Sequence, residues 1–274
     1  MPLPRRLEKL RRFLRWRCAG GGRLPLFWHV GRPNFGDDVN PTFFERITGR
    51  GLRLAVDRDR PHLLGAGSIL ERSTAASVIC GSGFLEPPAG VVRAGRLVAV
   101  RGERSAAAFP RQGDLLLGDP LVLVDGVVEA VPKAHRVGLV PHVTSVARWR
   151  GLNARHLAII DPADDPWRVI RAIASCEVVL SQSLHGLIVA DALGIPNAWI
   201  APSDAMRGGR FKFDDYFTTL DAPKEMVPEG RHLFDTPERC PVAVGRYRFV
   251  KAAYRAALEA AAAALADELA AGPA

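Results

Sequence analysis

The chain has 274 residues, 48% hydrophobic and 24% charged, so it is long enough for one large or two modest domains and is not a disordered chain. Its four cysteines lie far apart without a CxxC pair, which argues against a disulfide framework or a structural metal and fits a reducing cytoplasm. The net charge is +8, but the first 23 residues carry +7 of it, so the body is nearly neutral and no nucleic-acid partner is expected.

Residues 1–22 form a basic leader with leucines at helical spacing: Leu3, Leu7, Leu10 and Leu14, with arginines around them. Such a helix can lie on an anionic membrane surface through residues 3–18, with its leucines in the acyl boundary and its arginines at the headgroups. The alternative is a helix that packs on the body with its charges in water. No apolar run is long enough to cross a bilayer, and the N-terminal charges precede no apolar core of a secretory signal.

The region 23–133 alternates short apolar segments with glycine-rich turns. Strands are predicted at residues 24–30, 52–56, 62–64, 78–80 and 97–101, and helices at about 38–48 and from residue 102 to about 109. Strands that alternate with helices indicate an N-terminal α/β domain with a mostly parallel sheet. Ligands of such sheets bind beyond the carboxyl ends of the strands.

The region 134–238 has the same character, with strands predicted at 137–140, 157–160, 178–180 and 197–200 and helices at about 166–175 and after residue 183. Residues 239–274 are alanine-rich, and about 240–271 are predicted as one helix that packs back on the body. Its core positions are Tyr247, Val250, Tyr254 and Leu258. The predicted fold class is therefore α/β, with two Rossmann-like domains facing a cleft and a long C-terminal helix.

Residues 178–196 are the most informative segment: a buried strand, a short polar turn and an apolar helix closed by Gly194 and Pro196. The turn places His185 at the helix start, where unpaired N–H groups and a partial positive charge favour a phosphate or carboxylate. An imidazole there can transfer protons beside a bound anion. The alternative is that His185 only caps its own helix.

Seven blocks carry a family resemblance across about residues 30–220: NFGDD at 34–38, GAGS at 65–68, GSGF at 81–84, VRGERS at 100–105, GDP at 118–120, GLVPH at 138–142, and SLHG at 183–186 with ALGIP at 192–196. Together they resemble the polysaccharide pyruvyl transferase family, nearest to the bacterial exopolysaccharide ketal-forming type. The resemblance implies a fold similar to B-type glycosyltransferases, with phosphoenolpyruvate as co-substrate and no cofactor. It also implies that a sugar of a lipid-linked saccharide receives pyruvate as a cyclic ketal. With the leader, it predicts a cytoplasmic protein, peripheral at the inner face of the membrane.

In this resemblance His185 is the catalytic, proton-transferring residue. Family members commonly carry arginine two residues before it, where this chain has Ser183, so positive charge for the donor must come from elsewhere. The predicted donor-binding residues are Arg101, Arg104, His142, Ser183, Gly186 and Lys212, the last in a predicted loop that could close over the donor. The predicted acceptor-binding residues are Asn34, Asp37 and Asp38, and no metal site is expected.

Simpler alternatives stand beside these roles. Arg101 and Arg104 could pair with Glu103 or Asp119, the acceptor residues could be turn and cap residues, and His142 could be an ordinary turn residue. Asp191, inside an apolar helix, lies either on a solvent face or beside a buried cation.

Alternative functions also remain open. One is a nucleotide-sugar-dependent glycosyltransferase of the same fold, and another is a catalytically decayed assembly protein, marked by Ser183. A nicotinamide-dependent oxidoreductase is not expected, because the chain has no G-x-G-x-x-G turn with a downstream acid.

Overall fold

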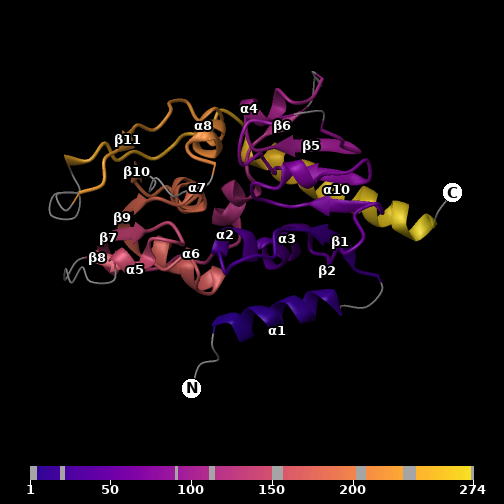
Figure 1. Cartoon of the computed structure of the whole chain (residues 1–274), viewed down its shortest axis with the longest axis horizontal. Helices are drawn as coiled ribbons and strands as arrows, with labels where there is room; N and C mark the ends of the chain where they lie inside the picture. The colour runs from indigo at the N-terminus through magenta and orange to yellow at the C-terminus, as the bar shows by residue number, and fades with distance from the viewer. Residues whose placement is uncertain are drawn as a thin grey trace.

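The computed structural model describes residues 5–18, 22–89, 92–110, 115–149, 157–201, 208–230 and 239–272. Two α/β units stand side by side, each built on its own parallel sheet, and a long helix closes the chain (Figure 1). The predicted fold class of two Rossmann-like domains with a long C-terminal helix is confirmed.

The N-terminal sheet has six parallel strands in the order β2-β1-β3-β4-β5-β6. They are β1 (Leu24–Phe27), β2 (Leu52–Leu54), β3 (His62–Leu64), β4 (Ser77–Cys80), β5 (Arg96–Val100) and β6 (Leu116–Leu117). Its helices are α2 (Phe35–Asp38), α3 (Asn40–Thr48) and α4 (Glu103–Ala106), with 3₁₀ segments η1 (Leu70–Arg72) and η2 (Pro120–Gly126). The predicted strands are all present.

The C-terminal sheet has five parallel strands in the order β11-β10-β9-β7-β8. They are β7 (His135–Val140), β8 (Leu157–Ile159), β9 (Cys176–Ser181), β10 (Asn197–Ile200) and β11 (Met226–Val227), with helices α5 (Val146–Trp149), α6 (Pro166–Ala174), α7 (Leu184–Ala192) and α8 (Phe211–Phe217). Read from β8, this order repeats the first five positions of the N-terminal sheet. The domains therefore share a topology although no sequence repeat is evident.

The helix boundaries follow local chemistry. Asp165 accepts hydrogen bonds from the N–H groups of Trp167 and Arg168 at the start of α6, and Pro166 occupies the first helical position. Gly194, with φ of +68°, supplies the left-handed turn after α7. The continuous apolar core includes η2 and α7, which pack together across the two domains.

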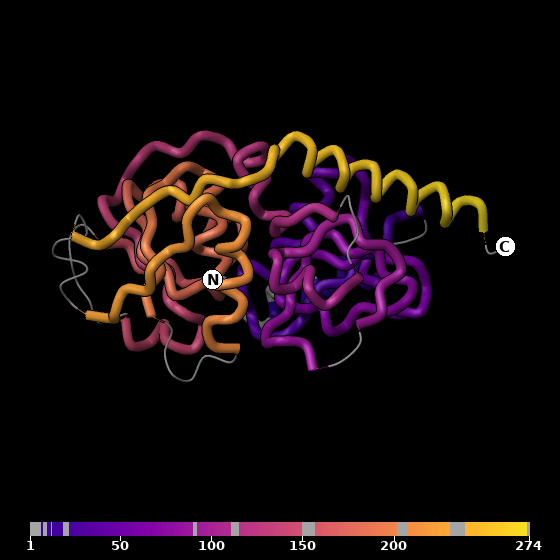
Figure 2. The backbone as a smooth tube through the Cα atoms, turned by 90° about the horizontal axis from the view of Figure 1, so that it is seen from above, coloured from indigo at the N-terminus to yellow at the C-terminus, as the bar shows by residue number. Residues whose placement is uncertain are grey.

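The C-terminal segment differs from the prediction. Helix α10 spans Lys251–Ala271, so the helix begins about ten residues later than predicted. Residues 239–250 run along the C-terminal domain in extended and turn conformations, where the N–H of Gly245 donates to Asp191. Asp191 is buried and pairs with Lys224 at 3.0 Å. Of the two alternatives for Asp191, the one beside a buried cation is therefore correct. Helix α10 then crosses to the N-terminal domain and packs on α3, β1, β3 and β5 (Figure 2).

Helix α1 (Arg5–Arg17) lies along one side of the N-terminal domain, where it contacts β2 (Figure 1). Trp16 is 3% exposed and fixes the helix to the body. Leu7, Leu10 and Leu14 are about half exposed, at 50%, 50% and 47%. The helix therefore packs on the body through one side and leaves a leucine row outside. Within the described residues, no helix has the length and apolarity to pass through a bilayer.

Candidate active site

The carboxyl ends of the two sheets border one cavity of about 310 Å³. The strand order reverses between β1 and β3 in one sheet and between β7 and β9 in the other, and open α/β sheets bind ligands at such points. Most of the lining follows these four strands, and the rest follows β4, β8 and β10: His29, Asn34, Asp37, Ser68, Ile69, Glu71, Arg72, Leu85, His142, Val143, Pro162, Ser183, Leu184, His185 and Lys212. The points at which the strand order reverses in the two sheets therefore meet at one site.

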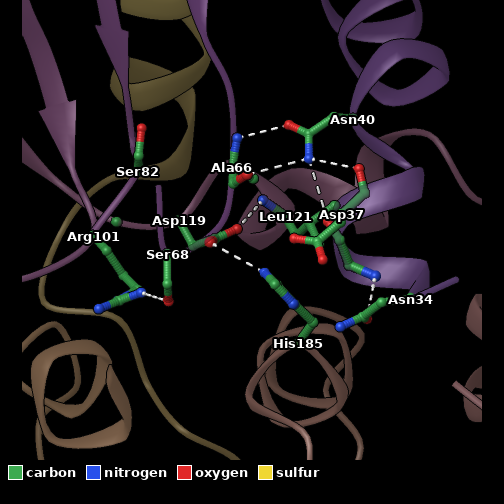
Figure 3. A network of polar contacts seen from close by, with 12 residues as sticks. Asn34, Asp37, Asn40, Ala66, Ser68, Ser82, Arg101, Asp119, Leu121 and His185 are labelled. Carbon is green, nitrogen blue, oxygen red and sulfur yellow. Dashed lines mark hydrogen bonds and ion pairs between the residues drawn. The ribbon is translucent and has the colours of Figure 1, made fainter. Parts of the chain in front are cut away.

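His185 extends from the first turn of α7 toward the N-terminal domain (Figure 3). Its ring lies against α2, where Phe35 contacts it edge-on and a β-carbon at Gly36 would overlap Nδ1. Burial lowers the pKa of His185 to about 3, with further contributions from the charges of Lys212 and Arg101. The imidazole is therefore neutral at pH 7 and able to accept a proton.

Asp119 faces this imidazole from the other domain. Its Oδ2 lies 3.8 Å from His185 Nε2, and neither atom has a hydrogen-bond partner in the part of the chain that the structure describes. Its Oδ1 accepts the N–H of Leu121 at 2.9 Å and so caps η2. Complete burial raises the pKa of Asp119 to about 6, although the Leu121 N–H and Arg101 oppose the shift. From the sequence, Asp119 was expected in a block of the family resemblance and as a possible partner for arginine, but not as a site residue.

Lys212 and Arg72 bring cationic side chains to the cavity. Lys212 lies in α8, not in a loop as predicted, and burial followed by Arg101 lowers its pKa to about 8 while Asp37 opposes the shift. His142 is neutral at pH 7, because burial and Lys212 lower its pKa to about 4. Arg72, at the end of η1, was not identified from the sequence. The positive charge at neutral pH therefore comes from Lys212 and Arg72.

Ser183 occupies the N-cap position of α7 on the cavity wall, without capping the helix through its side chain. Its N–H donates to the Ser181 hydroxyl at 3.0 Å. The first N–H groups of an α-helix have no partners within the helix, so the first turn of α7 offers donors and partial positive charge. This end of the cavity suits an anion.

Arg101 lies beneath the cavity with its side chain fully buried, and it is not part of the lining. Its Nε donates to Asp215 at 2.9 Å, Nη1 to the Ser68 hydroxyl at 2.8 Å and Nη2 to the Phe84 carbonyl at 2.5 Å. Asp215 also accepts from the N–H and hydroxyl of Ser105. Arg101 therefore supports Ser68, which lines the cavity, and ties α8 to the N-terminal domain.

Three more predicted site residues lie outside the lining. Arg104 is about half exposed and pairs with Asp214 at 3.5 Å. Gly186 lies where α7 approaches β7 and β9 too closely for a β-carbon. Asp38 Oδ2 accepts the N–H of Asn34 at 3.1 Å, which matches the alternative of a cap residue.

Asn34 and Asp37 line the cavity from the segment after β1. Asn34 Oδ1 accepts the N–H of Gly36, so it also caps α2. Nearby, the amide of Asn40 binds both the N–H and the carbonyl of Ala66, at 2.7 and 3.2 Å (Figure 3). This contact fixes the turns after β1 and β3 to each other, and thereby the wall that carries Asn34 and Asp37.

Six of the ten predicted site residues thus line the cavity: Asn34, Asp37, His142, Ser183, His185 and Lys212. No group of three or more potential metal ligands was found among the described residues. Asp119 was marked in the sequence by the GDP block at 118–120, but its approach to His185 depends on how the domains pack. Arg72 stands in no block of the resemblance.

Residues 96–204 match the family model described as polysaccharide pyruvyl transferase. This region belongs to the polysaccharide pyruvyl transferase family. The resemblance predicted from the sequence is thereby confirmed. The matched residues include both His185 and Asp119, as well as Arg101 and His142.

Two curated relatives extend the similarity. The succinoglycan biosynthesis protein ExoV of Rhizobium meliloti (strain 1021) is 30% identical over 208 residues, which cover 72% of this chain and 64% of that protein. The uncharacterised protein L143 of Acanthamoeba polyphaga mimivirus is 28% identical over 178 residues, which cover 60% and 62%. The chain therefore spans less than two thirds of the length of these relatives.

A crystal structure of a functionally uncharacterised protein from Klebsiella pneumoniae subsp. pneumoniae NTUH-K2044 aligns with a TM-score of 0.43 at 11% identity, covering 84% of this chain and 100% of that one.

Proposed function

We propose that the protein is a polysaccharide pyruvyl transferase that moves pyruvate from phosphoenolpyruvate to a saccharide, as a cyclic ketal, during exopolysaccharide biosynthesis. The observation that carries this proposal is one cavity in which a neutral histidine stands between an anion-binding helix start and polar residues of the opposite domain. The family match over residues 96–204 and the similarity to a succinoglycan biosynthesis protein support it.

The donor has two anionic groups to hold, a carboxylate and a phosphate. Lys212 and Arg72 provide charge, and the first turn of α7 with Ser183 provides neutral hydrogen-bond donors. His142 lines the same side as a neutral donor or acceptor. Arg101 acts from beneath, by fixing α8 and hence Lys212.

Ketal formation joins C2 of the donor to two sugar oxygens. One hydroxyl proton ends on the methylene carbon, which becomes a methyl group, and the other leaves with inorganic phosphate. His185 takes a proton from the attacking hydroxyl and passes it to the methylene carbon. Asn34 and Asp37 hold the acceptor hydroxyls on the side of the ring where Nδ1 lies against α2.

The direct test incubates purified protein with phosphoenolpyruvate and a synthetic glycoside, and follows phosphate release and acceptor mass. Pyruvate-ketal product is expected, and His185→Ala should lower the rate by about 10²- to 10⁴-fold. Arg104→Ala is the matched control and should retain the rate. Activity that survives His185→Ala would overturn the proton-transfer role. Turnover with a nucleotide sugar alone would favour the glycosyltransferase, and no turnover with either donor would favour a decayed assembly protein.

We also propose that the acceptor is lipid-linked and that the protein meets it in the cytoplasm, at the inner face of the membrane, through residues 3–18, of which 3 and 4 lie outside the described residues. Helix α1, which carries the exposed leucine row, lines a groove through Phe13 and Arg17. This groove also includes Val30 and Val56, which are 38% and 64% exposed. Arg72 lines both this groove and the cavity. A membrane at α1 would therefore lie beside the part of the cavity that Arg72 lines.

Vesicle co-sedimentation tests this contact. The protein should bind vesicles that contain anionic lipid, bind less at high salt, and lose binding when Leu7, Leu10 and Leu14 are all changed to serine. That variant should keep the wild-type rate on a soluble glycoside, because none of the three residues lines the cavity. Equal vesicle binding by the variant and the wild type would contradict the proposal.

A further inference from the structure

The contact between Asp119 and His185 crosses the domain boundary at the point where η2 packs on α7. Asp119 is completely buried and His185 is 8% exposed. Buried polar atoms in folded proteins nearly always have hydrogen-bond partners. Here Oδ2 and Nε2 face one another at 3.8 Å, and the described residues supply no other partner for either atom (Figure 3).

We propose that Asp119 is the positioning residue for His185: its Oδ2 accepts the proton of Nε2 and so fixes the tautomer in which Nδ1 is the base. This role rests on the proposed function. The distance of 3.8 Å exceeds that of a hydrogen bond, and catalytic hydrogen bonds often shorten when substrate binds. Nδ1 is then directed to α2, the side on which Asn34 and Asp37 line the cavity.

The surrounding charges explain why a carboxylate is needed there. The charged groups that act on His185 include Lys212 and Arg101, and both disfavour an imidazolium. Asp119 itself has Arg101 as its favourable charge, while its negative charge reaches Tyr254 and Tyr247. When His185 becomes cationic, Asp119 is the carboxylate that faces its ring.

The proton of the attacking sugar hydroxyl reaches the donor through Nδ1. The O–H bond of the sugar breaks and Nδ1–H forms, while the oxygen lone pair bonds to C2 of phosphoenolpyruvate. As this bond forms, the π electrons of the donor move to the methylene carbon and take up the Nδ1 proton there, so His185 returns to its neutral form. The C2–O bond to phosphate breaks when the second hydroxyl oxygen bonds to C2, and that hydroxyl proton leaves with the phosphate. The Nε2 proton stays between Nε2 and Oδ2 throughout, so Asp119 needs no net change of protonation.

A capping role explains only one of the two carboxylate oxygens of Asp119. Oδ1 caps η2 through the N–H of Leu121, but this leaves Oδ2 unaccounted for. Pairing with Arg101 does not account for Oδ2 either, because this oxygen has no hydrogen-bond partner among the described residues, Arg101 included.

Two substitutions separate positioning from capping. Asp119→Asn keeps the cap oxygen but turns an N–H donor toward Nε2, which selects the opposite tautomer. Asp119→Ser keeps a cap residue and removes the second oxygen. Both should lower kcat by about 10²- to 10⁴-fold and leave the KM for phosphoenolpyruvate unchanged, because neither removes a donor contact.

Nitrogen-15 NMR of histidine-labelled protein provides the second readout, with His185→Gln used to assign the signal. The proton of His185 should be on Nε2 in the wild type and on Nδ1 in Asp119→Asn. A wild-type kcat in either variant, or a proton on Nδ1 in the wild-type protein, would overturn the proposal. If Asp119→Asn fails to fold, Asp119→Ser decides the kinetics and the wild-type spectrum decides the tautomer. The spectrum requires no turnover, so it judges this pair separately from the proposed reaction.

Discussion

Two of the buried polar contacts between the domains differ in how fully their atoms are satisfied. In the contact between Arg101 and Asp215, the guanidinium donates to three acceptors, one of which is Asp215. The carboxylate of Asp215 accepts from three donors, one of which is Arg101. These five hydrogen bonds measure 2.5 to 2.9 Å. In the contact between Asp119 and His185, the facing atoms are 3.8 Å apart and unpaired among the described residues. A network in which every polar atom is paired stabilises the fold, whereas buried polar atoms without partners are typical of a functional site.

The two contacts also influence each other. Arg101 lowers the pKa values of both Asp119 and His185 from its buried position. The completed contact therefore contributes to the electrostatic environment of the incomplete one, in which burial is the largest effect. This dual effect explains how Arg101 can matter to the reaction without touching substrate.

Arg101→Met should produce the largest loss of stability. It leaves Asp215 buried without its charge partner, and breaking such a pair costs about 3–5 kcal/mol. Urea denaturation at pH 7 measures the free energy of unfolding. The double variant Arg101→Met with Asp215→Leu should recover part of the loss. A single variant as stable as the wild type would show that this contact does not hold the domains.

Asp119→Asn should instead raise the free energy of unfolding at pH 7. Burial raises the pKa of Asp119 from its usual 3.8 to about 6, so the ionised form is disfavoured in the folded state. Well below pH 3.8 the carboxyl is neutral in both states, and as the pH rises from about 4 to about 6 the wild type loses stability that the variant keeps. The variant should be more stable at pH 7 by on the order of 2–3 kcal/mol, and equal to the wild type at pH 3.5.

Thermal unfolding at the two pH values measures this difference, with Asp125→Asn as the matched control on the exposed end of η2. A gain that is the same at both pH values would mean that the ionisation of Asp119 is not its source.

Arg104→Ala should have the smallest effect. Arg104 is about half exposed, and its pair with Asp214 is shared with Arg210. Exposed ion pairs contribute about 0–1 kcal/mol, so urea denaturation should show a change within that range. A loss comparable to that of Arg101→Met would remove the contrast between a buried and an exposed arginine of the same block.

The sequence predicted the strands well because their apolar runs end at glycine-rich turns, and their shared sheet edge followed from parallel topology. It also located His185, since a strand, a polar turn and a capped helix are local features. It missed Arg72 and the role of Asp119, which depend on contacts between segments far apart in the chain. It placed Lys212 in a loop because the charged residues of α8 interrupt its apolar pattern. The structure nevertheless buries Phe213, Tyr216 and Phe217 of this helix.

The start of the C-terminal helix was predicted too early for a similar reason. Residues 240–250 have apolar side chains at helical spacing, but Pro241 and the Gly245 contact with Asp191 favour an extended path. Tertiary hydrogen bonds therefore decided the conformation of a segment whose pattern alone indicated a helix.

Helix α10 has a consequence for the order in which the protein is made. Tyr254, Leu258 and Leu265 are buried against the N-terminal domain, and the Tyr254 hydroxyl donates to the Gly118 carbonyl at 2.6 Å. The ribosome completes the six-stranded sheet long before it makes residues 251–271, so the nascent N-terminal domain emerges with that apolar surface bare. Of the two domains, the one made first is then the last to be finished, and the residue that precedes Asp119 is secured only after the C-terminal domain and α10 have been made.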